Sequence, residues 1–161
     1  IYGGRFFIVP EEIVMTDIRR LVKAGAEHIT FGDPDFFNGP KHGMNIIKKL
    51  NKEFPDLGYD VIIKVEHLLK HQNLLSNLVS TGCRFVTTAV ESINDDILFK
   101  LKKGHTLEDF RQVVKITKTL DLPLSPTFIP FTPWSTPSNY LELLKTIFDI
   151  LALYILSLIH I

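Results

Sequence analysis

The clearest indication of the fold is the segment Tyr59-Asp60-Val61-Ile62-Ile63-Lys64-Val65. It is short and rich in β-branched residues, and its apolar run is typical of a strand buried inside a sheet. The segments on either side, residues 44–54 and 68–79, carry apolar residues at helical spacing; the first stops before Pro55 and the second ends near Gly82. A buried strand between two helices indicates a parallel sheet joined by helical crossovers.

The same alternation continues in both directions along the chain. Gly25 can close the helix before the first strand, and Thr106-Leu107-Glu108-Asp109 resembles a capping box that opens a later helix. Strand starts recur about every 30 residues, which is the usual size of a βα unit. Strands are predicted over residues 28–33, 59–65, 84–90 and 124–131, and helices over residues 12–23, 44–54, 68–79, 95–103, 107–120 and 140–150.

The predicted fold class is α/β, as part of a (β/α) TIM-like barrel with parallel strands. An open, doubly wound sheet is the alternative. We favour the barrel because polar residues follow every predicted strand instead of gathering at one switch point. A closed eight-fold barrel needs about 250 residues. The chain has 161, so it can supply only part of one.

The charge balance argues against a polyanionic partner. Lys plus Arg and Asp plus Glu both number 18, so the net charge is zero and neither nucleic acid nor a membrane surface is expected. The single cysteine, Cys83, allows no internal disulfide. Together with the lack of a visible signal peptide, this fits a reducing compartment, and we expect a cytoplasmic location.

Both ends of the chain look like breaks in a longer reading frame. The first residues, Ile1-Tyr2-Gly3-Gly4-Arg5, contain no initiator Met, and the run Leu156-Ser157-Leu158-Ile159-His160-Ile161 resembles translated adapter sequence. We therefore expect residues 1–150 to form the partial barrel and residues 151–161 to be a non-native tail.

Polar side chains follow each predicted strand, at the end where βα barrels carry their active sites. The first strand is followed by Gly32-Asp33-Pro34-Asp35, the second by Glu66-His67, the third by Glu91-Ser92 and the fourth by Phe131-Thr132-Pro133-Trp134. Carboxylates suit an ammonium group, a ribose diol or a metal ion. The sequence therefore predicts a site at this rim.

Each of these segments also has a purely structural interpretation. Asp33-Pro34-Asp35 has the composition of a turn, and Ser92 can cap a helix whose first turn contains Asp95. Glu66-His67 can be a solvated pair, His105 a helix cap and Trp134 a lid on the core. Cys83 is better explained as a small core residue than as a nucleophile.

The ordered motifs resemble a known family, the radical S-adenosylmethionine (SAM) enzymes. The run from His28-Ile29-Thr30-Phe31-Gly32-Asp33 to Gly43 looks like the second-strand region of that family. The resemblance covers residues 1–150, and it is strongest to the subfamily with a Cys-Cys-Ala-Glu-Pro tail or its selenocysteine form (CCAEP or CUAEP). The motifs that continue it are Lys64-Val65-Glu66-His67, Thr88-Ala89-Val90-Glu91-Ser92, Lys103-Gly104-His105-Thr106 and Thr127-Phe128-Ile129-Pro130-Phe131-Thr132-Pro133-Trp134.

The resemblance implies a [4Fe–4S] cluster that cleaves SAM to a 5′-deoxyadenosyl radical, with an open choice of substrate. The family holds the cluster through a CxxxCxxC loop after its first strand, which is absent here, and Cys83 cannot replace it. Tyr2-Gly3-Gly4-Arg5-Phe6 looks like the segment that follows that loop. We therefore expect a truncated core that is inactive by itself.

The resemblance also assigns cofactor contacts to individual residues. Gly32, Asp33 and Asp35 match the segment that contacts the SAM amino group. Glu66, Glu91 and Ser92 match positions near the carboxylate or the ribose. The loop from Phe131 to Trp134 lies where adenine is usually packed, which suits an aromatic face.

Two other functions remain open from the residues alone. The first is a metal-dependent barrel lyase or hydrolase that uses Asp33, Asp35, Glu66, His67 and Glu91 as ligands or acid–base groups. The second is a non-catalytic barrel remnant or binding module.

Overall fold

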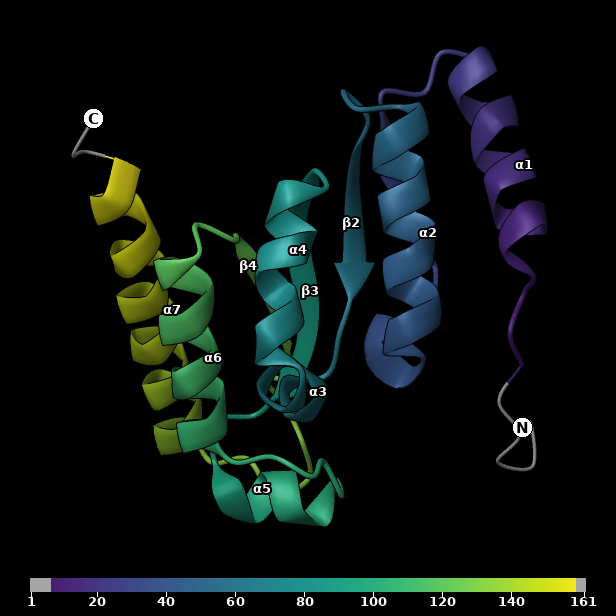
Figure 1. Cartoon of the computed structure of the whole chain (residues 1–161). Helices are drawn as coiled ribbons and strands as arrows, with labels where there is room; N and C mark the ends of the chain where they lie inside the picture. Colours follow the sequence, from purple (N-terminus) through teal and green to yellow (C-terminus); the bar gives the residue numbers. More distant parts are fainter. Residues whose placement is uncertain (1–6, 159–161) are drawn as a thin grey trace.

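A computed structural model describes residues 7–158, with side chains described up to Ile150. Its centre is a four-stranded parallel sheet in the order β1-β2-β3-β4 (Figure 1). The strands are β1 (His28–Thr30), β2 (Gly58–Ile62), β3 (Cys83–Glu91) and β4 (Leu124–Phe128). The helices are α1 (Glu11–Lys23), η1 (Phe36–Asn38), α2 (Pro40–Glu53), α3 (Val65–Lys70), η2 (Gln72–Leu74), α4 (Leu75–Ser80), α5 (Asp95–Lys100), α6 (Leu107–Thr119) and α7 (Pro137–Leu158).

The strand order confirms a segment of a βα barrel. Each strand pairs with its predecessor in the sequence, so the order never reverses. Figure 1 shows α2, α4 and α6 on the same side of the sheet. A doubly wound sheet reverses its order at a switch point and carries helices on both faces, whereas a barrel adds strands in one direction. The doubly wound alternative is therefore wrong for the described residues.

The hydrophobic core lies between the sheet and these helices. Alternate residues of a strand point to opposite faces, and the side chains of Tyr59 and Val61 on β2, and of Ile63 just after it, are fully buried on the helix side. The other face is more polar: Asp60 Oδ1 accepts a hydrogen bond from Thr30 Oγ1 and lies 2.7 Å from His28 Nε2. This second face corresponds to the interior of the barrel.

Local sequence signals explain where several helices begin and end. Gly25 follows α1 with φ of +98°, a conformation that glycine adopts without a Cβ clash. Pro40 opens α2, and α2 ends just before Phe54-Pro55. The predicted capping box is confirmed, because Thr106 Oγ1 accepts from Asp109 N while the Asp109 carboxylate accepts from Thr106 N.

Two boundaries differ from the sequence prediction. The second strand ends at Ile62, and Val65 and Glu66 already belong to the first turn of α3. The single helix predicted over residues 68–79 is divided into α3, η2 and α4. The break occurs at His71, whose φ of −116° is not helical. Helical spacing of apolar residues persists across such a short break, so periodicity alone did not reveal it.

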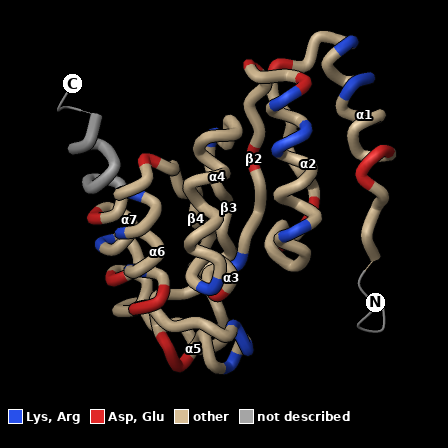
Figure 2. The backbone as a smooth tube through the Cα atoms, viewed as in Figure 1, with Lys and Arg blue, Asp and Glu red and all other residues tan. Residues whose placement is uncertain are grey.

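The last helix is longer than predicted. It begins at Pro137 and continues to Leu158, past the boundary expected at residue 150. The assignment of residues 151–161 to a non-native tail stays a prediction, and the predictions for residues 1–6 and 159–161 lie outside the described residues. Within residues 7–158, none of the helices combines the length and apolar character needed to cross a bilayer. In Figure 2 acidic and basic positions are interspersed along the backbone.

Candidate functional site

The predicted rim lies at the carboxyl ends of the strands, where α3 and α5 are also found (Figure 1). The parallel strands bring these ends to one edge of the sheet. The loop between α5 and α6, residues 101–106, comes to the same edge, since His105 Nε2 lies 3.1 Å from the carbonyl oxygen of Val90 at the end of β3. The strand ends and this loop, which are distant in sequence, therefore lie at one edge of the sheet.

The two aspartates after β1 have different environments. Asp33 is exposed, and one of its carboxylate oxygens accepts a hydrogen bond from Asp35 N at 2.9 Å. Asp35 is only 1% exposed. Its Oδ2 lies 3.4 Å from Lys64 Nζ and 2.8 Å from His67 Nδ1, although neither Oδ2 nor Nδ1 has a well-aligned hydrogen bond. The turn interpretation thus holds for Asp33, while Asp35 joins β1 to the start of α3.

Glu66 lies beside the loop between α5 and α6. A small cavity of about 130 Å³ has Glu66 on its wall, and its other lining residues are Lys64, Ala89, Lys102, Lys103, Gly104 and His105. The cavity lies between the end of β2 and that loop. Glu66 therefore shares this cavity with three lysines and no second carboxylate.

Glu91 ends β3 in an unusual backbone conformation. Its φ is +68°, which is rare for a residue with a Cβ, and the β3–β4 register shifts between Ala89 and Glu91. Its carbonyl oxygen accepts from Ile129 N at 2.8 Å, and its carboxylate Oε1 lies 3.1 Å from Lys103 Nζ. Strained residues at strand ends are often kept for function, so this position supports the prediction that Glu91 belongs to the site.

Ser92 is buried next to Glu91, but it does not cap a helix. Its hydroxyl accepts from Asn94 N, and Asn94 is the N-cap of α5, accepting from Ile97 N at 3.1 Å. The cap therefore lies two residues later than the sequence interpretation placed it. Asp95 is in the first turn of α5 as expected.

The aromatic residues after β4 are exposed. Phe131 is 72% exposed and stacks on Tyr140, with ring centroids 5.0 Å apart. Trp134 is 43% exposed, and Lys100 Nζ lies 5.3 Å from its ring centroid. The interpretation of Trp134 as a core lid is wrong, since the side chain is exposed and does not pack against the hydrophobic core of the described residues.

Two lysines that the sequence analysis did not assign to the site lie next to predicted site residues at the rim. Lys64 is close to Asp35, and Lys103 is close to Glu91. A row of alternating charge runs along the rim, which we call the charged row: Asp35, Lys64, Glu66, Lys103 and Glu91. The two lysines had a sequence signal, because Lys64 lies two residues after the end of β2 and Lys103 precedes Gly104. Gly32 and Asp33 lie exposed beside the row, and Phe131 and Trp134 follow the far strand.

A metal-centred interpretation finds no support in the described residues. Among them, no group of three or more His, Cys, Asp and Glu side chains is arranged to hold a metal ion.

Cys83 is buried, and burial raises the pKa of its thiol to about 12, so it stays protonated. The prediction that Cys83 is a core residue is confirmed.

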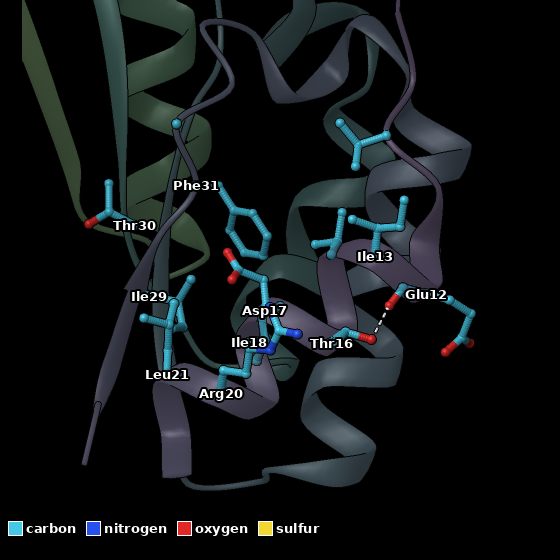
Figure 3. A pocket seen from close by; sticks show the side chains of 13 residues that line it. Glu12, Ile13, Thr16, Asp17, Ile18, Arg20, Leu21, Ile29, Thr30 and Phe31 are labelled. Carbon is cyan, nitrogen blue, oxygen red and sulfur yellow. Dashed lines mark hydrogen bonds between the residues drawn. The ribbon is translucent and has the colours of Figure 1, made fainter. Parts of the chain in front are cut away.

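A larger hollow lies elsewhere, between α1 and β1. Its volume is about 590 Å³. Figure 3 shows Phe31 and Ile13 projecting into it from opposite sides, with Thr16 and Asp17 along the helix. It runs beside β1, which is an edge of the described sheet. Its charged lining residues, Glu12, Asp17 and Arg20, all belong to α1, and no strand-end carboxylate lines it, so its size alone does not make it the site.

Protonation of His105 is expected to make stability depend on pH. Burial lowers the pKa of His105 below its usual 6.5 and nearby Lys103 lowers it further, while Val90, Asp109 and Glu66 oppose the shift. The folded state then binds its proton less readily than the unfolded state. This stabilisation is complete above pH 6.5 and is lost as pH falls through the lowered folded pKa.

Urea unfolding of the wild type and His105→Gln at about pH 7.5 and about pH 5.5 tests this expectation. The wild type should lose more unfolding free energy on acidification than the variant, which has no group titrating at this position. Burial also lowers the pKa of His71, which remains in both proteins and so cancels in the comparison. Equal losses would contradict the prediction.

The family model of the radical SAM superfamily matches residues 1–147. The radical SAM methyltransferase TsrM from Kitasatospora setae superposes with a TM-score of 0.71 at 18% identity, covering 92% of this chain and 28% of that one. The cobalamin-dependent SAM radical enzyme OxsB superposes with a TM-score of 0.71 at 18% identity, covering 83% of this chain and 21% of that one.

A more distant likeness is to archaeal Elp3 from Methanocaldococcus infernus, with a TM-score of 0.55 at 19% identity over 77% of this chain and 34% of that one. No curated protein matches the chain. At such identities the structural likeness concerns the fold. The chain spans less than a third of the TsrM and OxsB chains.

Proposed function

The chain belongs to the radical SAM superfamily, and from this membership we propose that its charged row is part of a pocket for S-adenosylmethionine. The observation that carries the proposal is the placement of alternating carboxylates and lysines at the carboxyl ends of successive parallel strands. SAM is a zwitterion at its methionine end and carries a ribose diol and a purine. A rim with both signs of charge and exposed aromatic rings offers a partner for each of these groups.

The two aspartates after β1 have different roles near the ammonium group of SAM in the proposed pocket. Asp33 is exposed, and its second carboxylate oxygen is available to an ammonium group. Asp35 is buried against Lys64 and His67, so it positions the loop instead of meeting the ligand. Gly32 is exposed and leaves the approach to Asp33 free of side chains.

The remaining parts of the ligand suit the other strand ends. Glu66 and Glu91 can accept from the ribose hydroxyls, and Lys64 or Lys103 can donate to the methionine carboxylate. Ser92 supports the turn after Glu91 through its bond with Asn94. Phe131 and Trp134 expose aromatic faces on which adenine can stack.

The residues of this chain do not fit a [4Fe–4S] cluster. A cluster of this type needs cysteine thiolates, and the chain contains a single cysteine, whose pKa is raised to about 12 by burial. No step through the cluster is therefore assigned to these residues. For the whole protein we propose the family reaction, in which a cluster held by cysteines outside this chain cleaves SAM to a 5′-deoxyadenosyl radical that acts on an unidentified substrate.

Two finer assignments belong to the same proposal. The motif from Phe31 to Gly43 and the Lys103-Gly104-His105-Thr106 motif support membership of the subfamily with the CCAEP or CUAEP tail. A buried, unpaired Cys83 and a neutral chain support a cytoplasmic protein whose partners are small molecules rather than nucleic acid or membrane.

Equilibrium dialysis with isotopically labelled SAM tests the proposed function. Saturable binding to the purified protein is expected, with S-adenosylhomocysteine as a competitor because it keeps the adenosine and amino acid groups. Asp33→Ala should weaken binding by about tenfold, the effect of losing one charge-assisted hydrogen bond. Asp56→Ala is the matched control, since this exposed aspartate lies outside the rim. No saturable binding would rule out the pocket.

A further inference from the structure

Three consecutive residues of the loop between α5 and α6 each meet a different group at the strand ends. Lys103 Nζ lies 3.1 Å from Glu91 Oε1, and His105 Nε2 lies 3.1 Å from the carbonyl oxygen of Val90. A Cβ on Gly104 would come within 2.6 Å of Glu66 Oε2, so the glycine backbone itself packs against that carboxylate. We call Lys103-Gly104-His105 the clasp.

The clasp can sit this close only because of its middle residue. Gly104 has φ of +55°, a left-handed conformation that costs glycine little. The same residue leaves room for the carboxylate of Glu66, because a Cβ at this position would displace it. Position and conformation therefore both favour glycine at 104.

The clasp is also fixed at its far end. Thr106 forms the capping box of α6 with Asp109, and Leu107 N donates to Asp95 Oδ1 at 2.8 Å. These bonds hold the loop to the start of α5 and to α6. The contact of His105 with β3 then decides how closely the loop approaches the strand ends.

The hydrogen bond of His105 with the Val90 carbonyl indicates which ring nitrogen carries the hydrogen. A carbonyl oxygen can only accept, so Nε2 must carry the hydrogen. Burial and the neighbouring Lys103 lower the pKa of His105, while Asp109 and Glu66 oppose this. A neutral ring anchors the loop without adding a cation that would compete with Lys103 for the glutamates.

We propose that His105 is a positioning residue, which holds the clasp against β3 and thereby fixes the carboxylates of Glu66 and Glu91 at the rim. The link from these carboxylates to SAM rests on the proposed function. The positioning itself rests only on the contacts of the clasp with Glu66, Glu91 and Val90.

The test compares His105→Leu with His105→Gln, because glutamine keeps a nitrogen donor near the place of Nε2 whereas leucine has none. Nitrogen NMR of the wild type should show hydrogen on Nε2. Side-chain carboxyl carbon signals of Glu66 and Glu91 should move in His105→Leu and stay close to wild type in His105→Gln. SAM affinity should fall about fivefold or more in His105→Leu and recover to within about twofold in His105→Gln.

The outcomes separate the two proposals. Unmoved Glu66 and Glu91 signals in folded His105→Leu, or a His105→Gln variant as impaired as His105→Leu, would overturn the positioning role. If these signals move in His105→Leu but the wild-type protein does not bind SAM, the positioning role is supported and the proposed function is rejected.

A double-mutant cycle covers the case in which His105→Leu does not fold. Gly104→Ala should displace the Glu66 carboxylate and so weaken SAM binding about fivefold in the wild-type background. In a Glu66→Ala background the added methyl group meets no carboxylate, and Gly104→Ala should change affinity less than about twofold. Equal effects in both backgrounds would overturn the role of the clasp in positioning Glu66.

Discussion

Asp35→Ala is expected to lower the free energy of unfolding by about 2 kcal/mol, because buried polar partners then lose their acceptor. The carboxylate is buried and accepts from Lys64 N, in addition to its contacts with the side chains of Lys64 and His67. Removing it disconnects β1 from α3. For a domain of this size the change corresponds to a fall in melting temperature of roughly 4–8 °C.

The Asp35→Asn variant separates the effect of the side chain's shape from the effect of its charge on the free energy of unfolding. The asparagine keeps an oxygen for Lys64 N but carries no charge for Lys64 and His67, so a loss of about 1 kcal/mol is expected. Asp17→Ala is the matched control, because Asp17 is exposed in the middle of α1 and alanine is the better helix former. Chemical unfolding of the variants measures all changes. An Asp35→Ala protein as stable as Asp17→Ala would show that Asp35 does not organise the rim.

Glu91→Gly is expected to weaken SAM binding by about tenfold or more while leaving stability nearly unchanged. The carboxylate is removed from the proposed pocket, which costs a charge-assisted hydrogen bond. Stability is affected in two opposite directions. The variant loses the ion pair with Lys103, yet glycine relieves the positive φ of +68°, so the net change should stay within about 1 kcal/mol.

Asp121→Gly provides the control for the backbone effect. Asp121 also has a positive φ, of +53°, but it is exposed between α6 and β4, away from the charged row. This variant should gain stability by a few tenths to about 1 kcal/mol and bind SAM as the wild type does. A Glu91→Gly protein that keeps full affinity would remove Glu91 from the site.

The fold was predictable because its signals are local. The β-branched run around Val61, the glycine after α1 and the capping box at Thr106 each act within a few residues of sequence. Strand order followed from chain connectivity. The break of the helix at His71 was not predictable, since the aromatic contact of this ring with Phe37 comes from a distant part of the chain.

The convergence of the strand-end carboxylates on one rim was predictable from the sequence, but the electrostatics of this rim were not. Position along the strands identified Asp35, Glu66 and Glu91, and the structure places lysines between them. Which charge neutralises which depends on the path of the loop after α5, which brings Lys103 to Glu91 twelve residues away. The positive φ of Glu91 had no sequence signal either, because no glycine marks that position.

The central claim is that the strand-end rim, and not another hollow, receives SAM. Nitrogen–proton NMR of the labelled protein during a SAM titration tests this most directly, because every backbone amide reports its own environment. We expect the largest shifts at Asp33, Glu66, Glu91, Ser92 and the clasp, with a shift of the Trp134 indole signal. Shifts confined to the hollow between α1 and β1, or no shifts at saturating SAM, would contradict the claim.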